Sequence, residues 1–431
     1  MKKVIKKILP AFVIGWYHKI LAVLAAVIYG RPSDKLIVIG VTGTNGKSTV
    51  VNLIAELLKA GGAKVGLTAT ANFKIGEEEW LNDQKMTMLG RFKTQKFLRE
   101  LVKAGCRYAV IETSSEGVKQ YRHLGINYDI LIFTNLTPEH LEAHGGFDNY
   151  KKAKGKLFQH LTNKKRKIIN GQKIDKTIIV NADDKYADYF LNFPADKKLT
   201  YSINKASDFQ AGDIKLQGNG TTFNLQHSTY KTNLLGLVNV YNCLAAMAAA
   251  KVQNIAEKKI KQALLEYQGV PGRFEFIETG KNFKVMVDYA PEPESMSKLY
   301  ETLKIFNFSK IIHVLGSCGG GRDGARQPVL GKLAADNADY VIVTNEDPYD
   351  DDPQKIIDHV ASGAEANNKV LNQNLFKILD RREAIQKALS LAQENDLVLI
   401  TGKGSEQFIC VAHGKKIPWD DRKVVRELLN E

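Results

Sequence analysis

Residues 38–49, VIGVTGTNGKST, decide the fold of this chain. The stretch begins in an apolar run over residues 36–41 that is typical of a buried strand. It turns at glycine and enters a helical pattern over residues 48–59. Glycines in such a turn let backbone N–H groups point at phosphate oxygens at the start of a helix. The lysine supplies a positive charge for the outer phosphates, and the serine hydroxyl can hold Mg²⁺. The sequence therefore predicts a loop that binds the phosphates of ATP, consisting of Gly43, Thr44, Asn45, Gly46, Lys47, Ser48 and Thr49.

The segments on either side of the loop alternate between strand-like and helix-like patterns, which predicts an α/β fold with a mostly parallel sheet. The stretch over residues 199–235 is rich in Thr, Asn and Gly and alternates in polarity, so we expect an antiparallel flank there. Residues 239–251 form an alanine-rich helical pattern that should be buried. The strands that we expect cover residues 36–41, 108–112, 129–134, 177–181, 285–288, 311–315, 340–344 and 397–401.

The turn Gly269-Val-Pro-Gly272 predicts a domain boundary, because the strand–helix alternation restarts after it. We therefore expect three parts. An N-terminal amphipathic segment covers residues 1–35, and a central P-loop ATPase domain covers residues 36–272. A C-terminal Rossmann-like α/β domain covers residues 273–431.

The N-terminal segment is basic and then apolar. Four lysines within the first seven residues precede an apolar stretch over residues 8–29, which His18 and Lys19 interrupt. The run after them, residues 20–29, is shorter than the ~20 residues that span a bilayer. A protein with an ATP site is not expected to be exported. We therefore expect a cytoplasmic location, and we do not expect the N-terminal segment to be a cleaved signal peptide. Two hypotheses stay open: peripheral membrane contact through a surface helix with a basic head, or a helix packed on the first domain.

Composition and charge favour an enzyme with small anionic substrates. The chain has 431 residues and a formal net charge of +14. Its lysines are spread over many segments and no aromatic-basic RNA motif is present, so we expect no nucleic-acid partner. The four cysteines form no Cys-x-x-Cys pair, which disfavours a zinc ribbon or a disulfide framework and fits a reducing compartment.

Polar residues follow two of the predicted strands on the side of the phosphate loop. Glu112 ends one strand, His140 comes shortly after another, and Lys154 follows in a helical pattern. A carboxylate and a neutral imidazole that face the loop could position metal ions to neutralise the γ-phosphate. Each residue is a weak signal alone, because a single Glu or His at a strand end is more often a capping or surface residue.

Together, in this order, these motifs resemble those of the Mur ligase family. The form Thr-Gly-Thr-Asn-Gly-Lys is that of Mur ligases and folylpolyglutamate synthetases, and Val41 stands where the more general Gly-x-x-x-x-Gly-Lys pattern has glycine. Similar segments at residues 234–246, 270–275, 287–290, 316–328, 402–406 and 421–422 extend the resemblance over residues 36–425.

The resemblance implies roles for the residues of the ATP site. Asn239, Asn242 and Asp288 would contact the nucleotide beside the phosphate loop. Mg²⁺ would be held by Ser48 and Glu112, and a second ion by His140 and a Lys154 that CO₂ has carbamylated. The catalytic residues would be Lys47, Lys154, His140 and Arg273.

The resemblance also implies the reaction. Within the family, the members that add the third residue of the wall peptide are the most similar. ATP would phosphorylate the terminal carboxylate of a muramoyl-peptide donor, and the amine of an amino acid acceptor would attack the acyl-phosphate. The residues implied for the donor are Ser114, Ser115, Gln120, Arg122 and Asn135, and those for the acceptor are Arg322, Asp347, Tyr349, Gly402 and Glu406.

The sequence departs from the family where substrates are recognised. The domain that holds the uridine nucleotide has no counterpart, and residues 85–91 stand near the place of the donor motif Thr-Thr-Pro. Tyr349 replaces the arginine of Asp-Asn-Pro-Arg that reads diaminopimelate, and a phenol brings no charge. We expect the acids around it to attract an amine, which favours lysine, ornithine or a neutral amino acid; they are Glu346, Asp347, Asp350, Asp351 and Asp352.

Three alternatives stay open. A folylpolyglutamate-type ligase also lacks a UDP-binding domain, although residues 346–348 and 402–406 favour Mur ligases. A ligase-like enzyme that acts on a lipid-linked wall precursor fits the apolar N-terminus but usually has a Cys-rich insert, which this chain lacks. A non-catalytic nucleotide-binding relative is disfavoured because Glu112, His140 and Lys154 are all present.

Overall fold

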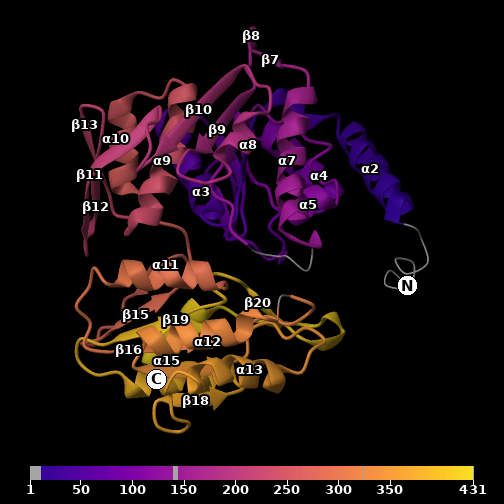
Figure 1. The fold of residues 1–431 in the computed structure, drawn as a ribbon. Coiled ribbons are helices and arrows are strands. Elements are labelled where there is room, and N and C mark those ends of the chain that lie inside the picture. Colours follow the sequence, from indigo (N-terminus) through magenta and orange to yellow (C-terminus); the bar gives the residue numbers. More distant parts are fainter. Residues whose placement is uncertain (1–10, 139–143, 323, 431) are drawn as a thin grey trace.

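Two β-sheets, each with helices on both faces, make up most of the chain (Figure 1). The computed structural model describes residues 11–138, 144–322 and 324–430. The strands of the first sheet lie within residues 37–232, and those of the second lie within residues 275–400. The predicted α/β class, with a mostly parallel first sheet and a second α/β unit, is confirmed.

The first sheet is built around β1 (Ile37–Thr42), which pairs in parallel with β5 (Tyr108–Glu112) and β6 (Ile130–Phe133). All six residues of β1 are buried, as are all residues of both neighbours. Such strands read as continuous apolar runs because helices cover both faces of a parallel sheet. The order is β13-β12-β11-β10-β9-β6-β1-β5-β2-β3-β4. The bounds are β1 (Ile37–Thr42), β2 (Val65–Thr68), β3 (Asn72–Ile75), β4 (Glu78–Leu81), β5 (Tyr108–Glu112), β6 (Ile130–Phe133), β9 (Thr177–Asn181), β10 (Lys197–Ser202), β11 (Phe209–Gln217), β12 (Gly220–Leu225) and β13 (Ser228–Thr232).

The antiparallel flank is shorter than the sequence suggests. β10 pairs in parallel with β9 and also with β11, and only β11–β13 are antiparallel to one another. A short helix, α8 (Ala187–Leu191), lies between β9 and β10 and provides the crossover that a parallel pair requires. The expectation of an antiparallel flank from residue 199 is therefore wrong for β10. At the opposite edge, β2, β3 and β4 form an antiparallel extension that the sequence did not predict.

Two groups of helices cover the first sheet. On one face α3 (Lys47–Ala60), α9 (Leu237–Val252) and α10 (Glu257–Glu266) pack together. Residues 242–250 of α9 are all buried, as the alanine-rich pattern predicted, and their small side chains let α9 approach α3 closely. On the other face lie α4 (Arg91–Lys103), α7 (Phe147–Asn163) and α8, with the short helix α5 (Ser115–Lys119) beside α7.

The second sheet is parallel except for its first strand. Its order is β14-β15-β19-β16-β17-β18, with β14 antiparallel at the edge. Figure 1 shows α11 (Pro293–Leu303) on the side that faces the first domain. The strands are β14 (Glu275–Ile277), β15 (Lys284–Val287), β16 (Ile311–Leu315), β17 (Tyr340–Thr344), β18 (Leu375–Ile378) and β19 (Leu397–Ile400). The helices are α11 (Pro293–Leu303), α12 (Arg326–Asn337) and α13 (Pro353–Glu365) on one face, and α14 (Arg381–Leu391) and α15 (Asp421–Asn430) on the other.

Short elements complete the fold. In the part of the chain that the structure describes, two hairpins of two strands each lie outside the large sheets. They are β7 (Ile168–Ile169) with β8 (Gln172–Lys173), and β20 (Phe408–Cys410) with β21 (Lys416–Pro418). Single 3₁₀ turns occur at η1 (Pro32–Lys35) and η2 (Ala412–Gly414).

The N-terminal helix α2 (Ala11–Ile28) packs on the first domain with one side only. Ala22, Ala25 and Ala26 are buried, and α2 contacts α4. The packed-helix hypothesis is therefore confirmed for this small-residue side. The other side exposes large apolar residues, namely Trp16, Tyr17, Ile20, Val23, Leu24, Val27 and Ile28. Among the described helices, none has the length and hydropathy needed to cross a membrane.

A buried ion cluster fixes the start of the central strands. Asp129, just before β6, is fully buried and accepts hydrogen bonds from the Nζ atoms of Lys167 at 2.5 Å and Lys176 at 3.0 Å. It also accepts one from the backbone N–H of Val38 in β1 at 2.9 Å. The cluster thus ties β1 to the segment between α7 and β9.

Asp129→Ala should destabilise the protein strongly, because it leaves two buried ammonium groups without their anion. We expect a loss of about 3–5 kcal/mol in the free energy of unfolding. Urea denaturation measures this as a lower midpoint at unchanged slope. Glu77→Ala, which removes an exposed ion pair with Lys59, is the control and should leave the midpoint unchanged. An Asp129→Ala midpoint equal to that of the control would contradict the structural role.

Candidate active site

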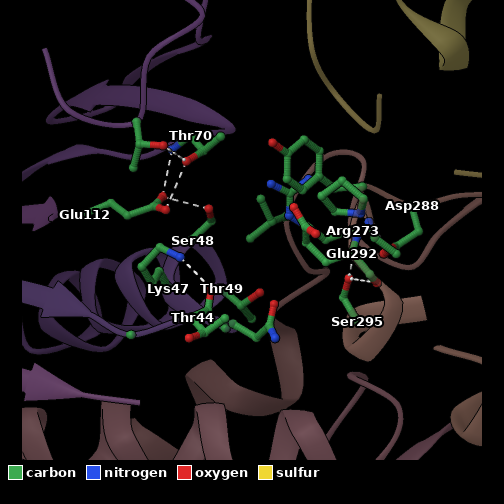
Figure 2. Close-up of a pocket in the computed structure, with 18 of the residues that line it drawn as sticks. Thr44, Lys47, Ser48, Thr49, Thr70, Glu112, Arg273, Asp288, Glu292 and Ser295 are labelled. Carbon is green, nitrogen blue, oxygen red and sulfur yellow. Dashed lines mark hydrogen bonds between the residues drawn. The ribbon is translucent and has the colours of Figure 1, made fainter. Parts of the chain in front are cut away.

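A cavity of about 1000 Å³ lies between the two domains. Its walls come from the phosphate loop, the loop after β4, the start of α9, and the first loops of the C-terminal domain. Figure 2 shows Lys47, Ser48 and Glu112 on one side, and Arg273, Asp288 and Glu292 on the other. Groups from both domains therefore face one space.

The phosphate loop has the geometry that its glycines predicted. Gly46 lies before the first turn of α3 with φ of 81°, a left-handed conformation that side chains disfavour. A Cβ on Gly46 would come within 2.4 Å of Asn242 Oδ1, so glycine also allows α9 to approach. Lys47 Nζ lies over the loop and donates to Thr44 O at 2.6 Å. The loop therefore presents an ammonium group and a helix N-terminus to the cavity, which together bind anions.

Oxygen ligands suited to Mg²⁺ meet beside the loop. Ser48 Oγ donates to Glu112 Oε2 at 2.7 Å. Thr70 donates to the same carboxylate through its backbone N–H at 2.7 Å and through its hydroxyl at 2.9 Å (Figure 2). A hydroxyl and a carboxylate at the head of a phosphate loop are the donors that Mg²⁺ prefers. The residues present therefore fit the ion that the sequence implied for Ser48 and Glu112.

Lys154 reaches the phosphate loop from α7. Its side chain is buried, donates from Nζ to Gly43 O at 2.8 Å, and lies 4.6 Å from the centre of the Tyr150 ring. The fold thus places Lys154 next to the loop, as the sequence prediction required. His140 lies outside the described residues, so its place beside Lys154 stays a prediction.

The other residues predicted to bind ATP fall into two groups. Asn239 and Asn242 line the cavity at the start of α9 and are joined by a 2.8 Å hydrogen bond. Across the cavity, the Arg273 guanidinium stacks 4.1 Å from the centre of the Tyr289 ring. Asp288 accepts from the backbone N–H groups of Phe274 and Ala290, so it holds the loop that carries Arg273.

Three of the five predicted donor residues line the cavity. Ser114, Ser115 and Arg122 do so, whereas Gln120 lies behind and accepts from Arg122 at 2.7 Å. Asn135 does not line the cavity. It accepts from the backbone N–H of Asn45 at 2.8 Å and so supports the phosphate loop.

The predicted acceptor residues are divided by depth. Arg322 lines the cavity, whereas the other four lie behind its wall. Gly402 has φ of 103°, and a Cβ there would come within 2.4 Å of Glu346 Oε2. Tyr349 packs against Gly320, whose added Cβ would meet its ring at 2.7 Å.

A buried ion cluster contains two of these acceptor residues. Lys403 Nζ donates to Asp347 Oδ1 and to Glu406 Oε2, both at 2.9 Å. Lys85 Nζ, from the central domain, donates to Asp347 Oδ2 at 2.5 Å and to Glu406 Oε2. Burial opposes the charged form of Lys85, but Glu406 and Asp347 outweigh it and hold the pKa of Lys85 above its ordinary value.

The expected acidic surface that would attract an amine is not formed. Asp347 is paired with two lysines, as above. Asp350 and Asp351 accept from the backbone N–H groups of His413 and Gly320, and Asp352 caps α13. These acids serve as loop and cap residues because each has backbone donors within reach.

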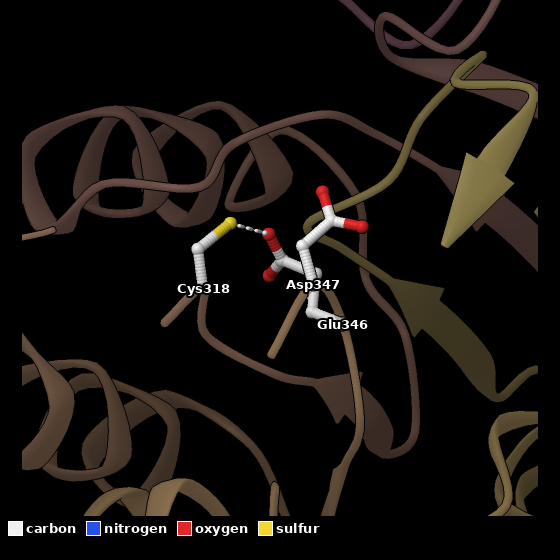
Figure 3. A group of neighbouring side chains, drawn as sticks. All are labelled: Cys318, Glu346 and Asp347. Carbon is white, nitrogen blue, oxygen red and sulfur yellow. Dashed lines mark hydrogen bonds between the residues drawn. The ribbon is translucent and has the colours of Figure 1, made fainter. Parts of the chain in front are cut away.

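Glu346 lies in a buried group with Cys318 and Asp347, and Asp347 also belongs to the ion cluster of Lys85 and Lys403 (Figure 3). Cys318 Sγ donates to Glu346 Oε1 at 2.7 Å, and burial raises the pKa of the Cys318 thiol. Because both oxygens of Asp347 accept from lysines, a metal ion there would have to displace an ammonium group.

Sequence reasoning missed several residues of the cavity. Thr70 holds Glu112, and its only signal is a place two residues after β2. His144 lines the cavity with Nε2 3.2 Å from Ser115 Oγ, and burial lowers its pKa. The same segment of the sequence contains His140, and no pattern in it distinguishes His144. Lys85 is the first residue of the segment 85–91, and nothing in the sequence indicates which acidic residues it pairs with.

Comparison with known proteins matches this arrangement. The profile of the Mur ligase middle domain matches residues 41–250, and that of the Mur ligase, glutamate ligase domain matches residues 272–404. The chain belongs to the Mur ligase family. The family resemblance inferred from the motifs is thereby confirmed.

The similarity of this Mur ligase to curated proteins extends over nearly its whole length. It is 36% identical to a UDP-N-acetylmuramoyl-L-alanyl-D-glutamate–2,6-diaminopimelate ligase from Bacillus cereus, over 97% of this chain and 83% of the relative. It is 37% identical to a UDP-N-acetylmuramyl-tripeptide synthetase from Roseiflexus, over 95% of this chain and 82% of the relative. This Mur ligase is accordingly an ATP-dependent acid–amino-acid ligase of peptidoglycan precursor synthesis.

Solved structures show the same fold. A UDP-N-acetylmuramoyl-L-alanyl-D-glutamate–2,6-diaminopimelate ligase aligns with a TM-score of 0.60 at 31% identity, over 92% of this Mur ligase and 78% of that chain. Folylpolyglutamate synthase of Mycobacterium tuberculosis aligns with a TM-score of 0.71 at 16% identity, over 96% and 95%. At that identity the likeness is one of fold alone.

Lys47→Ala should abolish ATP turnover while leaving the fold intact, because Lys47 donates its hydrogen bond to Thr44 of its own loop and its charge would act on the phosphates of bound ATP. Phosphate release measures turnover, and circular dichroism with the urea midpoint checks the fold. Lys59→Ala, at the other end of α3, is the matched control and should keep full turnover. Phosphate release by a folded Lys47→Ala variant at the control's rate would refute the assignment.

Proposed function

We propose that the protein adds an amino acid to the terminal carboxylate of a muramoyl-peptide, using ATP and Mg²⁺. The observation that carries the proposal is one cavity with the phosphate loop and the Ser48–Glu112 pair on one side and Arg273 on the other. Its relatives are named for UDP-N-acetylmuramoyl peptides and 2,6-diaminopimelate, which supports this class of donor and an amino acid acceptor.

The site divides the chemistry between the two domains. Lys47 and Arg273 stabilise negative charge on the transferred phosphoryl group from opposite sides. Mg²⁺, when held by Ser48 and Glu112, supplies further positive charge to the same group. Ser115 and Arg122 orient the donor, since a guanidinium forms paired hydrogen bonds with carboxylates. Closure of the domains excludes water, which would hydrolyse the acyl-phosphate before the acceptor amine attacks.

The acceptor is proposed to be an amino acid other than diaminopimelate. Tyr349 is mostly buried and its hydroxyl offers one uncharged hydrogen bond, whereas arginine would offer a charged fork to a second carboxylate. Losing such a charge-assisted pair costs about 1.5–3 kcal/mol, or roughly tenfold to a hundredfold in selectivity.

A ligation assay tests the function and the acceptor together. Phosphate release and product mass are measured with ATP, Mg²⁺, UDP-linked or lipid-linked muramoyl-dipeptide, and a panel of amino acids. We expect a product with alanine or another amino acid at a higher kcat/KM than with diaminopimelate. Lys47→Ala is the blank. The absence of any product with every donor and acceptor would reject the ligase function, and a preference for diaminopimelate would reject the acceptor proposal.

Lys154 is proposed to carry a carbamate when the enzyme is active. An ammonium group beside Mg²⁺ is repelled, whereas a carbamate is an oxygen anion that can act as a ligand. Lys154→Ala should lower activity by roughly a hundredfold or more, and acetate or another small carboxylate should partly restore it. ¹³C NMR after bicarbonate labelling should show a carbamate in the wild type. The matched control is Lys152→Ala, an exposed lysine of the same helix, and activity of Lys154→Ala equal to that control would refute the role.

We also propose that α2 contacts an anionic membrane surface. Seven large apolar residues project from one side of α2 at helical spacing, and two of them, Trp16 and Tyr17, are types that favour the membrane interface. Four lysines precede the helix in sequence and complement anionic lipid headgroups. Lys19 of α2 lies 5.1 Å from the ring of Tyr121, next to the donor residue Arg122, so the helix adjoins the donor side of the cavity.

Sedimentation with lipid vesicles tests this contact. The wild type should bind vesicles that contain phosphatidylglycerol more tightly than neutral phosphatidylcholine vesicles, and less tightly at high salt. The variant Ile20→Gln with Leu24→Gln should bind at least about tenfold more weakly, because two apolar side chains are lost from the contact. The matched control is Val370→Gln with Leu371→Gln, an exposed apolar pair of the other domain. Equal vesicle binding by both double variants would contradict the membrane proposal. So would a wild-type dimer that is disrupted by Ile20→Gln with Leu24→Gln and not by the control, because the apolar side of α2 would then be a contact between two copies of the chain.

A further inference from the structure

The contact between Lys85 and the C-terminal domain suggests a determinant of acceptor choice, and this inference rests on the ligase function proposed above. Lys85 belongs to the loop between β4 and α4, and its two partners, Asp347 and Glu406, belong to the other domain. Its side chain is only 9% exposed. The contact therefore joins the domains at the cavity.

Without Lys85 the cluster would be a site for one ammonium group. Within the C-terminal domain, Lys403 is paired with both Asp347 and Glu406. Two carboxylates that share one lysine carry one net negative charge, and that charge is buried. A buried charge of this kind requires a partner, since leaving it unpaired is strongly unfavourable. The Nζ of Lys85 occupies that place.

Lys85 also separates this acid pair from the cavity. Lys85 lines the cavity wall together with Met86, Thr87 and Met88, whereas Asp347 and Glu406 do not line it. A molecule that enters the cavity thus meets the lysine side chain before it can reach either carboxylate. An acceptor with an ammonium group on its side chain would be repelled by Lys85 and would find no free anion there.

The loop around Lys85 is fixed from several sides. Asn82 Nδ2 donates to Ala69 O at 2.9 Å and to Met86 O at 3.0 Å. The hydroxyl groups of Thr87 and Thr70 form a hydrogen bond of 2.9 Å. The backbone O of Met88 accepts from Arg122, a residue of the donor side. Lys85 is therefore held in place by residues next to Glu112 and the donor site, which is what a built-in substitute for a ligand requires.

We propose that Lys85 takes the place of a substrate ammonium group between Asp347 and Glu406, and so restricts the acceptor to amino acids that have no ammonium group on the side chain. The side-chain ammonium of lysine or ornithine would compete with a residue that the protein holds in its own structure. A competitor that is part of the same chain has a high effective concentration.

The acceptor preference of Lys85→Met tests the proposal. Methionine keeps the length of the side chain and removes its charge, so the vacated acid pair becomes available to the acceptor. The wild type should use alanine at a higher kcat/KM than ornithine or lysine. In Lys85→Met the ratio of kcat/KM for ornithine to that for alanine should rise about tenfold to a hundredfold, mainly through KM. The matched control is Lys93→Met, an exposed lysine that contacts the same loop through Gln84, and its ratio should equal that of the wild type.

A second measurement does not depend on ligation. The melting temperature of Lys85→Met should rise with n-butylammonium chloride but not with tetramethylammonium chloride, which has no N–H donor, because a ligand that binds the folded state stabilises it. The wild type and Lys93→Met should respond equally to both salts. If Lys85→Met does not fold, Lys85→Gln replaces it in both experiments.

The outcomes separate this proposal from the proposed function. A wild type that ligates no amino acid rejects the ligase function, and the melting experiment then decides whether Lys85 covers an ammonium site. A wild type that prefers ornithine or lysine overturns the proposal. An unchanged ratio in Lys85→Met, or a melting temperature that does not respond to butylammonium, overturns it as well.

Discussion

The close approach of Gly46 to Asn242 is the constraint on which the active site depends. It requires a residue without Cβ at the N-terminus of α3 and a helix, α9, whose side chains are small enough to lie against α3. The same contact brings Asn239 and Asn242 to the cavity beside the phosphate loop. The packing of the first domain and the shape of the nucleotide site therefore both depend on the short distance between Gly46 and Asn242. A change in α3 or α9 that increased this distance would alter the packing and the site together.

Charge pairing in the buried regions follows a related pattern: Asp129, Asp347 and Arg381 each have more than one partner. Arg381 donates to both oxygens of Asp421 and to the backbone oxygens of Asn345 and Thr401, which joins α14, α15 and two strand ends of the second sheet. Desolvation of such groups is costly, and several hydrogen bonds are needed to offset it.

Much of the fold followed from the sequence because its signals are local. The strands around the phosphate loop are unbroken apolar runs, and the alanine-rich pattern of α9 could belong only to a buried helix. The site was predictable where a residue acts through its own motif, as Lys47, Ser48 and Glu112 do. The parallel pairing of β10 was not predictable, because register and direction depend on a crossover whose helix, α8, is only five residues long. Lys85 and Asp347 are 262 residues apart in the sequence, and no pattern in a single sequence records such a contact.

The order of the domains along the chain has a consequence for synthesis. Among the described residues, every strand of the first sheet precedes every strand of the second, and the chain passes between the sheets over residues 267–274. The first domain is thus complete on the ribosome before the second has been made, and it can fold without waiting for it. Its phosphate loop is then formed early, whereas the far wall of the cavity, within residues 268–322, belongs to a sheet whose inner strand β19 emerges later. During that interval the nascent chain has a nucleotide-binding half without the half that completes the reaction.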